Sequence, residues 1–255
     1  MTIRVAKGSL AFAIADETLP EQLAFEQFVT KSGVSMSANL REAFKKTVLL
    51  QRPTNRAQVL VDSPVLLVPV EEYKEDDVTA IYQHSFPYTE GSVVMTNVLP
   101  DLNAVALFAV NKDLKLVVDD HYSDVKFVTL MRPVWSYLHR RSFIGNRRKL
   151  FVHFHDDALE IFAFDRNRFA FSNHFNVRHT KDVVYFILFV WQQLALDQRK
   201  DELYLSGTIY DRDALLGDLR RYIRTVITVN FSADFNRAPM TRIKGITLDI
   251  MTMYI

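Results

Sequence analysis

Hydrophobic and polar residues alternate at the start of the chain, and helical spacing follows. Residues 3–15 form two alternating runs that break at Lys7-Gly8, which predicts a β-hairpin with glycine at its turn. Residues 38–50 place apolar side chains at helical spacing, and Ser37 is expected to cap this helix. A short apolar run at 57–61 predicts a buried strand, and a more polar helix is expected after it.

The second half of the chain repeats this order of elements. Residues 150–165 predict another hairpin, and residues 167–175 predict a third strand. A helix is expected over 181–196, a short strand over 202–206 and a last helix over 213–224. The first of these helices is apolar on nearly every side, so we expect it to be buried between a sheet and other helices.

The two halves align with each other at their hairpins. When Gly8 is placed opposite Asp157, Asp16 falls opposite Asp165, and SLAFAIA lies against ALEIFAF. The same order of elements at nearly constant spacing indicates an internal duplication. Strands that alternate with helices require mixed sheets with helices packed on them, so the sequence predicts an α/β protein of two lobes.

The boundary between the lobes is expected near the turn at Gly145-Asn146. Residues 1–145 would form the first lobe and residues 146–255 the second. Further strands and helices predicted over 92–140 would complete the first lobe. The apolar residues 246–255 fit no element clearly.

Composition narrows the classes of function. The net charge of +1 gives no general attraction to nucleic acid, which is therefore not expected as a partner. The absence of cysteine excludes disulfides, thiolate metal sites and cysteine nucleophiles, and it fits a reducing compartment. The longest apolar run, residues 183–191, is shorter than the roughly 20 residues that span a bilayer. We therefore expect a cytoplasmic protein without a transmembrane segment.

This duplicated arrangement resembles the actin-like ATPase superfamily, which is built from two ribonuclease-H-like lobes of order βββαβα. The local strings FILF, LYLSG and LRRYIR are similar to those of a family of Bacteroidetes proteins, a domain of unknown function with an actin-like fold. The resemblance covers most of the second half and, more loosely, the whole chain. It implies the fold, and the pilus-assembly members of the superfamily suggest a protein partner by analogy.

The resemblance also implies where a nucleotide and its magnesium ion would bind. Superfamily members hold ATP between the lobes with two hairpin turns and a glycine-containing segment beside the adenosine. The matching positions in this chain are Lys7, Gly8, Ser9, Asp156, Asp157, Ser206, Gly207 and Thr208. The first turn lacks the usual leading aspartate, the second lacks glycine, and the third position has one glycine instead of two. The resemblance therefore implies a degenerate nucleotide cleft.

A second pattern could bind a metal ion. His153, His155 and Asp157 form an H-x-H-x-D sequence at the end of a predicted strand. Alternate residues of a strand point to one face, so the three side chains could meet a divalent ion. The alternative is a pair of histidines on an exposed strand face. The basic run at 139–149 could likewise dock an acidic partner, nucleic acid or membrane phosphates, or it could serve as a solvated linker.

Three hypotheses for function follow. In the first, the chain is a non-catalytic binding or assembly module with an unidentified protein partner. In the second it is an ATP-binding protein or a slow ATPase or kinase, in which Asp157 positions magnesium, Lys7 meets a phosphate and Gly207 lies against adenine. In the third it is a metal-dependent hydrolase that uses His153, His155 and Asp157. The sequence contains neither a G-x-S-x-G motif nor a glycine-rich P-loop.

Overall fold

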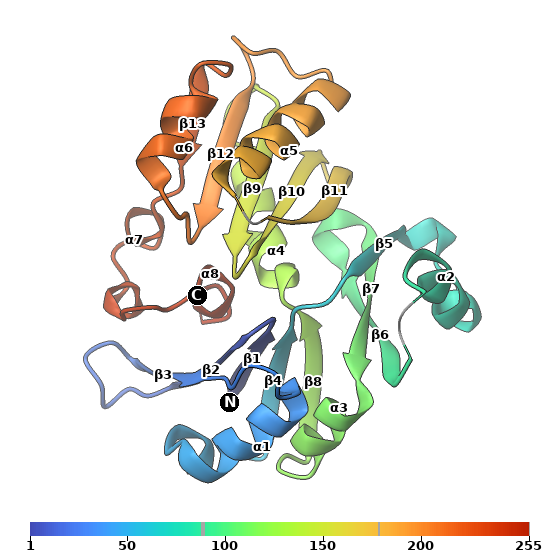
Figure 1. Ribbon diagram of the computed structural model, residues 1–255, viewed down its shortest axis with the longest axis vertical. Helices are drawn as coiled ribbons and strands as arrows, with labels where there is room; N and C mark the ends of the chain where they lie inside the picture. The colour runs from blue at the N-terminus through green and yellow to red at the C-terminus, as the bar shows by residue number, and fades with distance from the viewer. Residues whose placement is uncertain (88–89, 178, 255) are drawn as a thin grey trace. The chain divides into compact units, whose positions relative to one another are not determined.

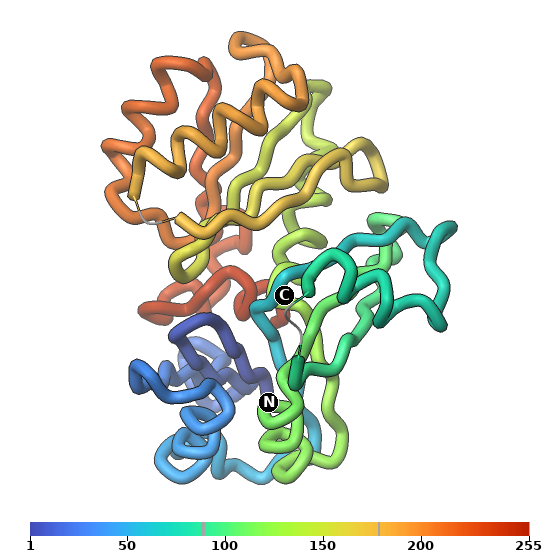
Figure 2. The backbone as a smooth tube through the Cα atoms, turned by 45° about the vertical axis from the view of Figure 1, so that its right-hand side comes forward, coloured from blue at the N-terminus to red at the C-terminus, as the bar shows by residue number. Residues whose placement is uncertain are grey.

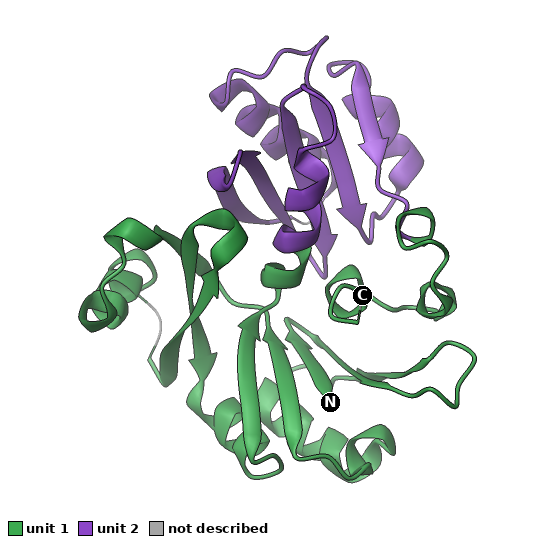
Figure 3. Cartoon of the chain, turned by 180° about the vertical axis from the view of Figure 1, so that it is seen from behind, with its two compact units in different colours: residues 1–134, 232–255 green, residues 135–231 purple. Residues whose placement is uncertain are grey.

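The computed structural model describes residues 1–87, 90–177 and 179–254, and its strands and helices fall into two units. Unit 1 comprises residues 1–134 together with 232–255, and unit 2 comprises residues 135–231 (Figure 3).

Unit 1 is organised around a five-stranded mixed sheet of order β3-β2-β1-β4-β8 (Figure 1). Strands β1 to β3 are antiparallel, whereas β4 runs parallel to both β1 and β8. Apolar residues such as Ile3 and Phe12 point to one face, where they form a hydrophobic core with the helices α1 and α3. The elements are β1 (Thr2–Ala6), β2 (Ser9–Ala15), β3 (Leu23–Val29), α1 (Met36–Lys46), a 3-10 turn (Leu49–Gln51), β4 (Arg56–Val61), α3 (Lys112–Asp119) and β8 (Asp124–Thr129).

A smaller antiparallel sheet of order β5-β7-β6 is inserted between β4 and β8. Its helix α2 packs on it through Tyr82, which is fully buried and donates a hydrogen bond of 2.8 Å to the carbonyl oxygen of Pro64. The elements are β5 (Val65–Pro69), α2 (Val78–Ser85), β6 (Ser92–Leu99) and β7 (Ala104–Asn111), with 3-10 turns at Val70–Glu72, Glu75–Asp77 and Pro100–Leu102.

The C-terminal segment packs on the second face of the unit 1 sheet. It contains a 3-10 turn (Pro239–Arg242) and the short helix α8 (Leu248–Met251). Met240 and Ile250 join Ala13 and other residues of the sheet in a hydrophobic cluster. Tyr254 donates a hydrogen bond of 2.9 Å to the carbonyl oxygen of Ala13. In Figure 2 this red segment runs beside the blue strands of the N-terminus.

Unit 2 has a five-stranded sheet of order β11-β10-β9-β12-β13. Helices α5 and α6 pack on one face through Ile187, Val190 and Leu216. The part of α4 that belongs to unit 2 lies on the other face, where the ring of Trp135 lies 5.3 Å from that of Phe169. The elements are α4 (Met131–Ser142), β9 (Lys149–His155), β10 (Ala158–Asp165), β11 (Arg168–Asn176), α5 (Thr180–Gln193), β12 (Glu202–Gly207), α6 (Arg212–Leu219) and β13 (Thr225–Thr228). The short helix α7 (Phe231–Asp234) follows, and its residues from Ser232 on belong to unit 1.

The strand orders of the two sheets are equivalent, which confirms the predicted duplicated α/β fold. β1 and β9 occupy the same central position, and each starts a hairpin that is followed by a third strand and a helix. The predicted boundary assigns residues 232–255 to the second lobe, whereas in the structure this segment is part of unit 1. The reason is that its apolar side chains cover the otherwise open face of the first sheet.

Three details differ from the predictions. Helix α1 is capped by Ser35 and not by Ser37, because the Ser35 hydroxyl accepts the backbone N–H of Ala38. Helix α6 ends at Leu219 rather than near residue 224. Helix α5 is not buried on all sides, since Tyr185 and Phe189 are exposed.

Helices long and apolar enough to cross a bilayer are absent from residues 1–87, 90–177 and 179–254.

Candidate functional site

The first hairpin turn is held by the chain's own hydrogen bonds. Ala6 pairs with Ser9, so Lys7 and Gly8 form the turn, and Gly8 adopts a left-handed φ of 85° that favours glycine. The Ser9 hydroxyl accepts a hydrogen bond of 2.8 Å from the Arg4 guanidinium. The Gly8 carbonyl accepts another, of 2.6 Å, from the hydroxyl of Thr30. The Lys7 side chain is exposed.

The second hairpin turn carries two carboxylates. His155 pairs with Ala158, which places Asp156 and Asp157 at the two positions that Lys7 and Gly8 occupy in the first hairpin. The alignment of Gly8 with Asp157 made from the sequence therefore holds in the structure. Asp156 is half-buried and has a left-handed φ of 48°, while Asp157 is exposed.

Gly207 is required by the packing of strand β12 against β9. A Cβ atom at this position would lie 2.0 Å from the carbonyl oxygen of Phe154, and the φ of Gly207 is 86°. The backbone N–H of Thr208 donates to the same carbonyl at 3.1 Å. The side chain of Ser206 is buried and donates a hydrogen bond of 3.2 Å to the carbonyl oxygen of Val152. The glycine thus makes room for the protein's own backbone.

A small pocket in unit 2 joins the second hairpin to the segment after β12. It has a volume of about 170 Å³, and its lining includes Asp156, Asp157, Thr208 and Thr180 at the first turn of α5. Pockets for small molecules and cofactors usually measure about 300–1,000 Å³. This pocket is therefore smaller than a usual cofactor site, and two carboxylates of the second hairpin turn line it.

A larger cavity lies within unit 1, where the end of the main sheet meets the inserted sheet. Its volume is about 510 Å³, which falls within the usual range for a ligand site. Most of its lining is apolar and includes Val61, Phe86 and Ala109, and Lys7 and Asp62 contribute charged groups. Of the residues singled out from the sequence, Lys7 lines this cavity.

A buried polar cluster lies on the face of the unit 2 sheet opposite α5. His155, Glu160 and His174 come from β9, β10 and β11, and their ligand atoms all lie within 4.8 Å of one another. Of the three residues that the sequence suggested as metal ligands, His155 belongs to this cluster, whereas His153 and Asp157 do not. His153 has its Nδ1 atom 3.0 Å from the Ser206 hydroxyl.

Glu160 is the central carboxylate of this cluster. Its Oε1 atom accepts a hydrogen bond of 2.7 Å from His174 Nδ1 and lies 3.7 Å from His155 Nε2. Burial alone would raise the pKa of Glu160, but the two imidazoles together outweigh burial and lower the pKa below its usual value. Sequence reasoning missed Glu160 and His174, which are directly opposite each other in the β10–β11 register. The signal that could have indicated this pair is a polar residue at each of two directly opposed positions of paired strands.

The basic run at 139–149 is largely used within unit 2. His139 is buried, and its Nε2 atom donates to the carbonyl oxygen of Arg166 at 2.9 Å. Lys149 is also buried and donates to two carbonyl oxygens, and desolvation lowers its pKa. Arg148 pairs with Asp201 at 2.9 Å.

Comparison with known proteins places the chain in a family. A model of the family described as "Protein of unknown function (DUF3822)" matches residues 1–226. A structure from Bacteroides thetaiotaomicron, described as a protein with actin-like ATPase fold and unknown function, is 25% identical and superposes with a TM-score of 0.85, covering 99% of this chain and 93% of that one. The PilM–PilN type IV pilus biogenesis complex matches with 12% identity and a TM-score of 0.58, covering 91% of this chain and 88% of that one. None of the curated proteins matches. The chain therefore belongs to the DUF3822 family, and its fold is that of the actin-like ATPases.

Proposed function

We propose that this chain is a non-catalytic binding or assembly module, which holds an apolar segment of a protein partner in the unit 1 cavity and performs no nucleotide chemistry. The cavity is the observation that carries the proposal. At about 510 Å³ it is large enough for one or two side chains of a partner, and its lining is mostly apolar.

The position of the cavity supports a partner site. It is lined from several elements at once: the ends of β1 and β4, the last turn of α2, and β7. Such a junction of rigid elements can hold an inserted side chain in a fixed place. Asp62 and Lys7 lie at the same cavity and offer hydrogen bonds to the backbone of a bound segment.

The nucleotide positions support the absence of ATP chemistry. The backbone of Phe154 occupies the space that the absent side chain of Gly207 leaves. Asp156 and Asp157 stand where a glycine-containing turn would aim backbone amides at a phosphate. The PilM–PilN complex, whose fold is similar, is an assembly of two proteins, and by analogy the actin-like fold of this chain would serve in protein association.

The test compares two tryptophan variants in quantitative co-purification with chemical cross-linking from the native cell. Ala109→Trp places a large ring in the cavity, because Ala109 is part of its lining. Ala80→Trp, on the exposed side of α2 in the same inserted region, is the matched control. We expect a partner that cross-links to wild type and Ala80→Trp and is depleted with Ala109→Trp.

Retention of every partner by a correctly folded Ala109→Trp variant would contradict the proposal. Circular dichroism and the urea midpoint establish that both variants are folded. Cross-links should map to residues around the cavity in unit 1, and cross-links confined to unit 2 would also count against the proposal.

A further inference from the structure

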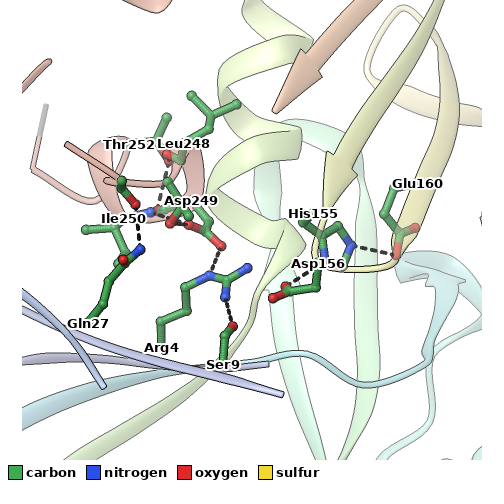
Figure 4. A network of polar contacts seen from close by, with 12 residues as sticks. Arg4, Ser9, Gln27, His155, Asp156, Glu160, Leu248, Asp249, Ile250 and Thr252 are labelled. Carbon is green, nitrogen blue, oxygen red and sulfur yellow. Dashed lines mark hydrogen bonds and ion pairs between the residues drawn. The ribbon is translucent and has the colours of Figure 1, made fainter. Parts of the chain in front are cut away.

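Three side chains from neighbouring strands of unit 2 carry ligand atoms for a metal ion. We propose that His155, Glu160 and His174 bind a divalent transition-metal ion, with Zn²⁺ the best match to this ligand set. All three residues belong to unit 2, and this proposal does not rest on the proposed function. Figure 4 shows His155 between Asp156 and Glu160.

The register of the sheet brings these side chains together. Glu160 is directly opposite His174 on β11 and opposite His153 on β9, so these three residues share one face. His155 lies two residues beyond His153 on the same strand, and alternate residues of a strand point to the same side. Three adjacent strands therefore each contribute one ligand.

The distances fit zinc coordination after a small adjustment. Zinc binds imidazole nitrogen and carboxylate oxygen at about 2.0–2.2 Å, so ligand atoms of a tetrahedral site lie about 3.3 Å apart. Here Glu160 Oε1 lies 3.7 Å from His155 Nε2 and 2.7 Å from His174 Nδ1. One distance shortens and the other lengthens by about half an ångström on binding, and the ion replaces the hydrogen bond between His174 and Glu160.

A second carboxylate lies close to one of the histidines. Asp156 Oδ2 lies 3.5 Å from His155 Nδ1, on the side of the ring away from Glu160. Histidines that bind zinc commonly donate their other ring N–H to a carboxylate, which fixes the tautomer and increases the basicity of the ligand nitrogen. With the proton on Nδ1, the lone pair of His155 Nε2 faces Glu160.

The ligand set selects the class of ion. Two imidazoles and one carboxylate suit zinc and its neighbours in the first transition row, whereas magnesium and calcium prefer oxygen ligands alone. Three protein ligands are typical of zinc sites in which water or a substrate atom takes the fourth position. Glu160 and His155 are buried, so the ion would be held largely out of solvent.

The competing explanation is a hydrogen-bonded ion pair without metal, and direct metal titration separates the two. The purified chain is treated with chelator, dialysed, and titrated with Zn²⁺ by calorimetry and with Co²⁺ by absorption spectroscopy. We expect one ion per chain and the intense visible bands of four-coordinate Co²⁺. Glu160→Gln and His174→Gln should each weaken the binding of Zn²⁺ at least tenfold, and Asp156→Asn should weaken it about 10–100-fold.

Matched variants control for other sites. Asp157→Asn changes the neighbouring turn residue, and His84→Ala removes an exposed histidine of α2, so both should bind as wild type does. Should Glu160→Gln fail to fold, His174→Gln remains decisive because the His174 side chain is 32% exposed. The proposal is overturned if no stoichiometric ion binds, or if folded His174→Gln binds Zn²⁺ as tightly as wild type.

Discussion

The guanidinium Nε atom of Arg4 lies 2.6 Å from the carboxylate Oδ2 of Asp249 and joins the first strand of the chain to its last helix (Figure 4). Both side chains are almost wholly buried, with 4% and 1% of their surface exposed. The other Asp249 oxygen, Oδ1, accepts hydrogen bonds from the hydroxyl of Thr247 and, at 2.8 Å, from the backbone of Ile250. The C-terminal segment is therefore tied to unit 1 by charge as well as by apolar packing.

Removal of one partner of this pair should destabilise the protein strongly. Asp249→Ala leaves the Arg4 charge buried without its carboxylate, which typically reduces the free energy of unfolding by about 3–5 kcal/mol. Urea denaturation measures the loss. Asp124→Ala is the control, because Asp124 forms an exposed ion pair with Arg56 and should lose less than about 1 kcal/mol. Equal losses of unfolding free energy in the two variants would contradict a larger contribution of the buried pair to stability.

Two glycine substitutions should have opposite effects on stability. Gly207→Ala places a Cβ atom 2.0 Å from the Phe154 carbonyl oxygen at a left-handed φ, so we expect a loss of about 3 kcal/mol or more. Gly217→Ala, in the exposed part of α6, meets no atom within 4 Å and should stabilise by about 0.4–1 kcal/mol. Thermal unfolding of both variants measures these two changes in stability. A harmless Gly207→Ala would mean that Gly207 is kept for some purpose other than backbone packing.

Tyr122 should make stability sensitive to alkaline pH. Burial raises the pKa of Tyr122 from 10.0 to about 12. Because the folded state holds this proton more tightly, its contribution to stability is complete below pH 10 and is lost as the pH rises toward 12. Among the described residues the Tyr122 hydroxyl has no hydrogen-bond partner, so Tyr122→Phe should not destabilise at pH 7.

The measurement is the free energy of unfolding of wild type and Tyr122→Phe between pH 7 and pH 11. The difference between the two proteins should shift in favour of Tyr122→Phe above pH 10, by up to about 1.4 kcal/mol per pH unit. A difference that stays constant over this range would contradict the burial of the hydroxyl.

The duplicated fold could be predicted because its signals are local. Each hairpin has alternating apolar residues on both sides of a two-residue turn, and a helix and a short strand follow. The same order occurs twice, so one half supported the interpretation of the other. The insertion with β6 and β7 was also visible as strands, although the sequence did not indicate that they form a separate sheet.

What could not be predicted depends on partners distant in the sequence. Arg4 and Asp249 are separated by 245 residues, and no local pattern links them. The apolar stretch that begins at residue 246 fits no element clearly, because residues 246–254 pack as a covering segment with one short helix. Helix α5 carries Tyr185 and Phe189, which are apolar yet exposed, so composition alone does not define its buried face. Glu160 and His174 meet only through strand register.

The most direct test of the central claim is calorimetric titration of magnesium-ATP into the purified chain at millimolar nucleotide. The binding module proposed above should give no saturable heat, because the Phe154 backbone lies against Gly207 and two carboxylates stand at the second turn. The result that would contradict the account is saturable binding of magnesium-ATP that is abolished in folded Asp157→Ala.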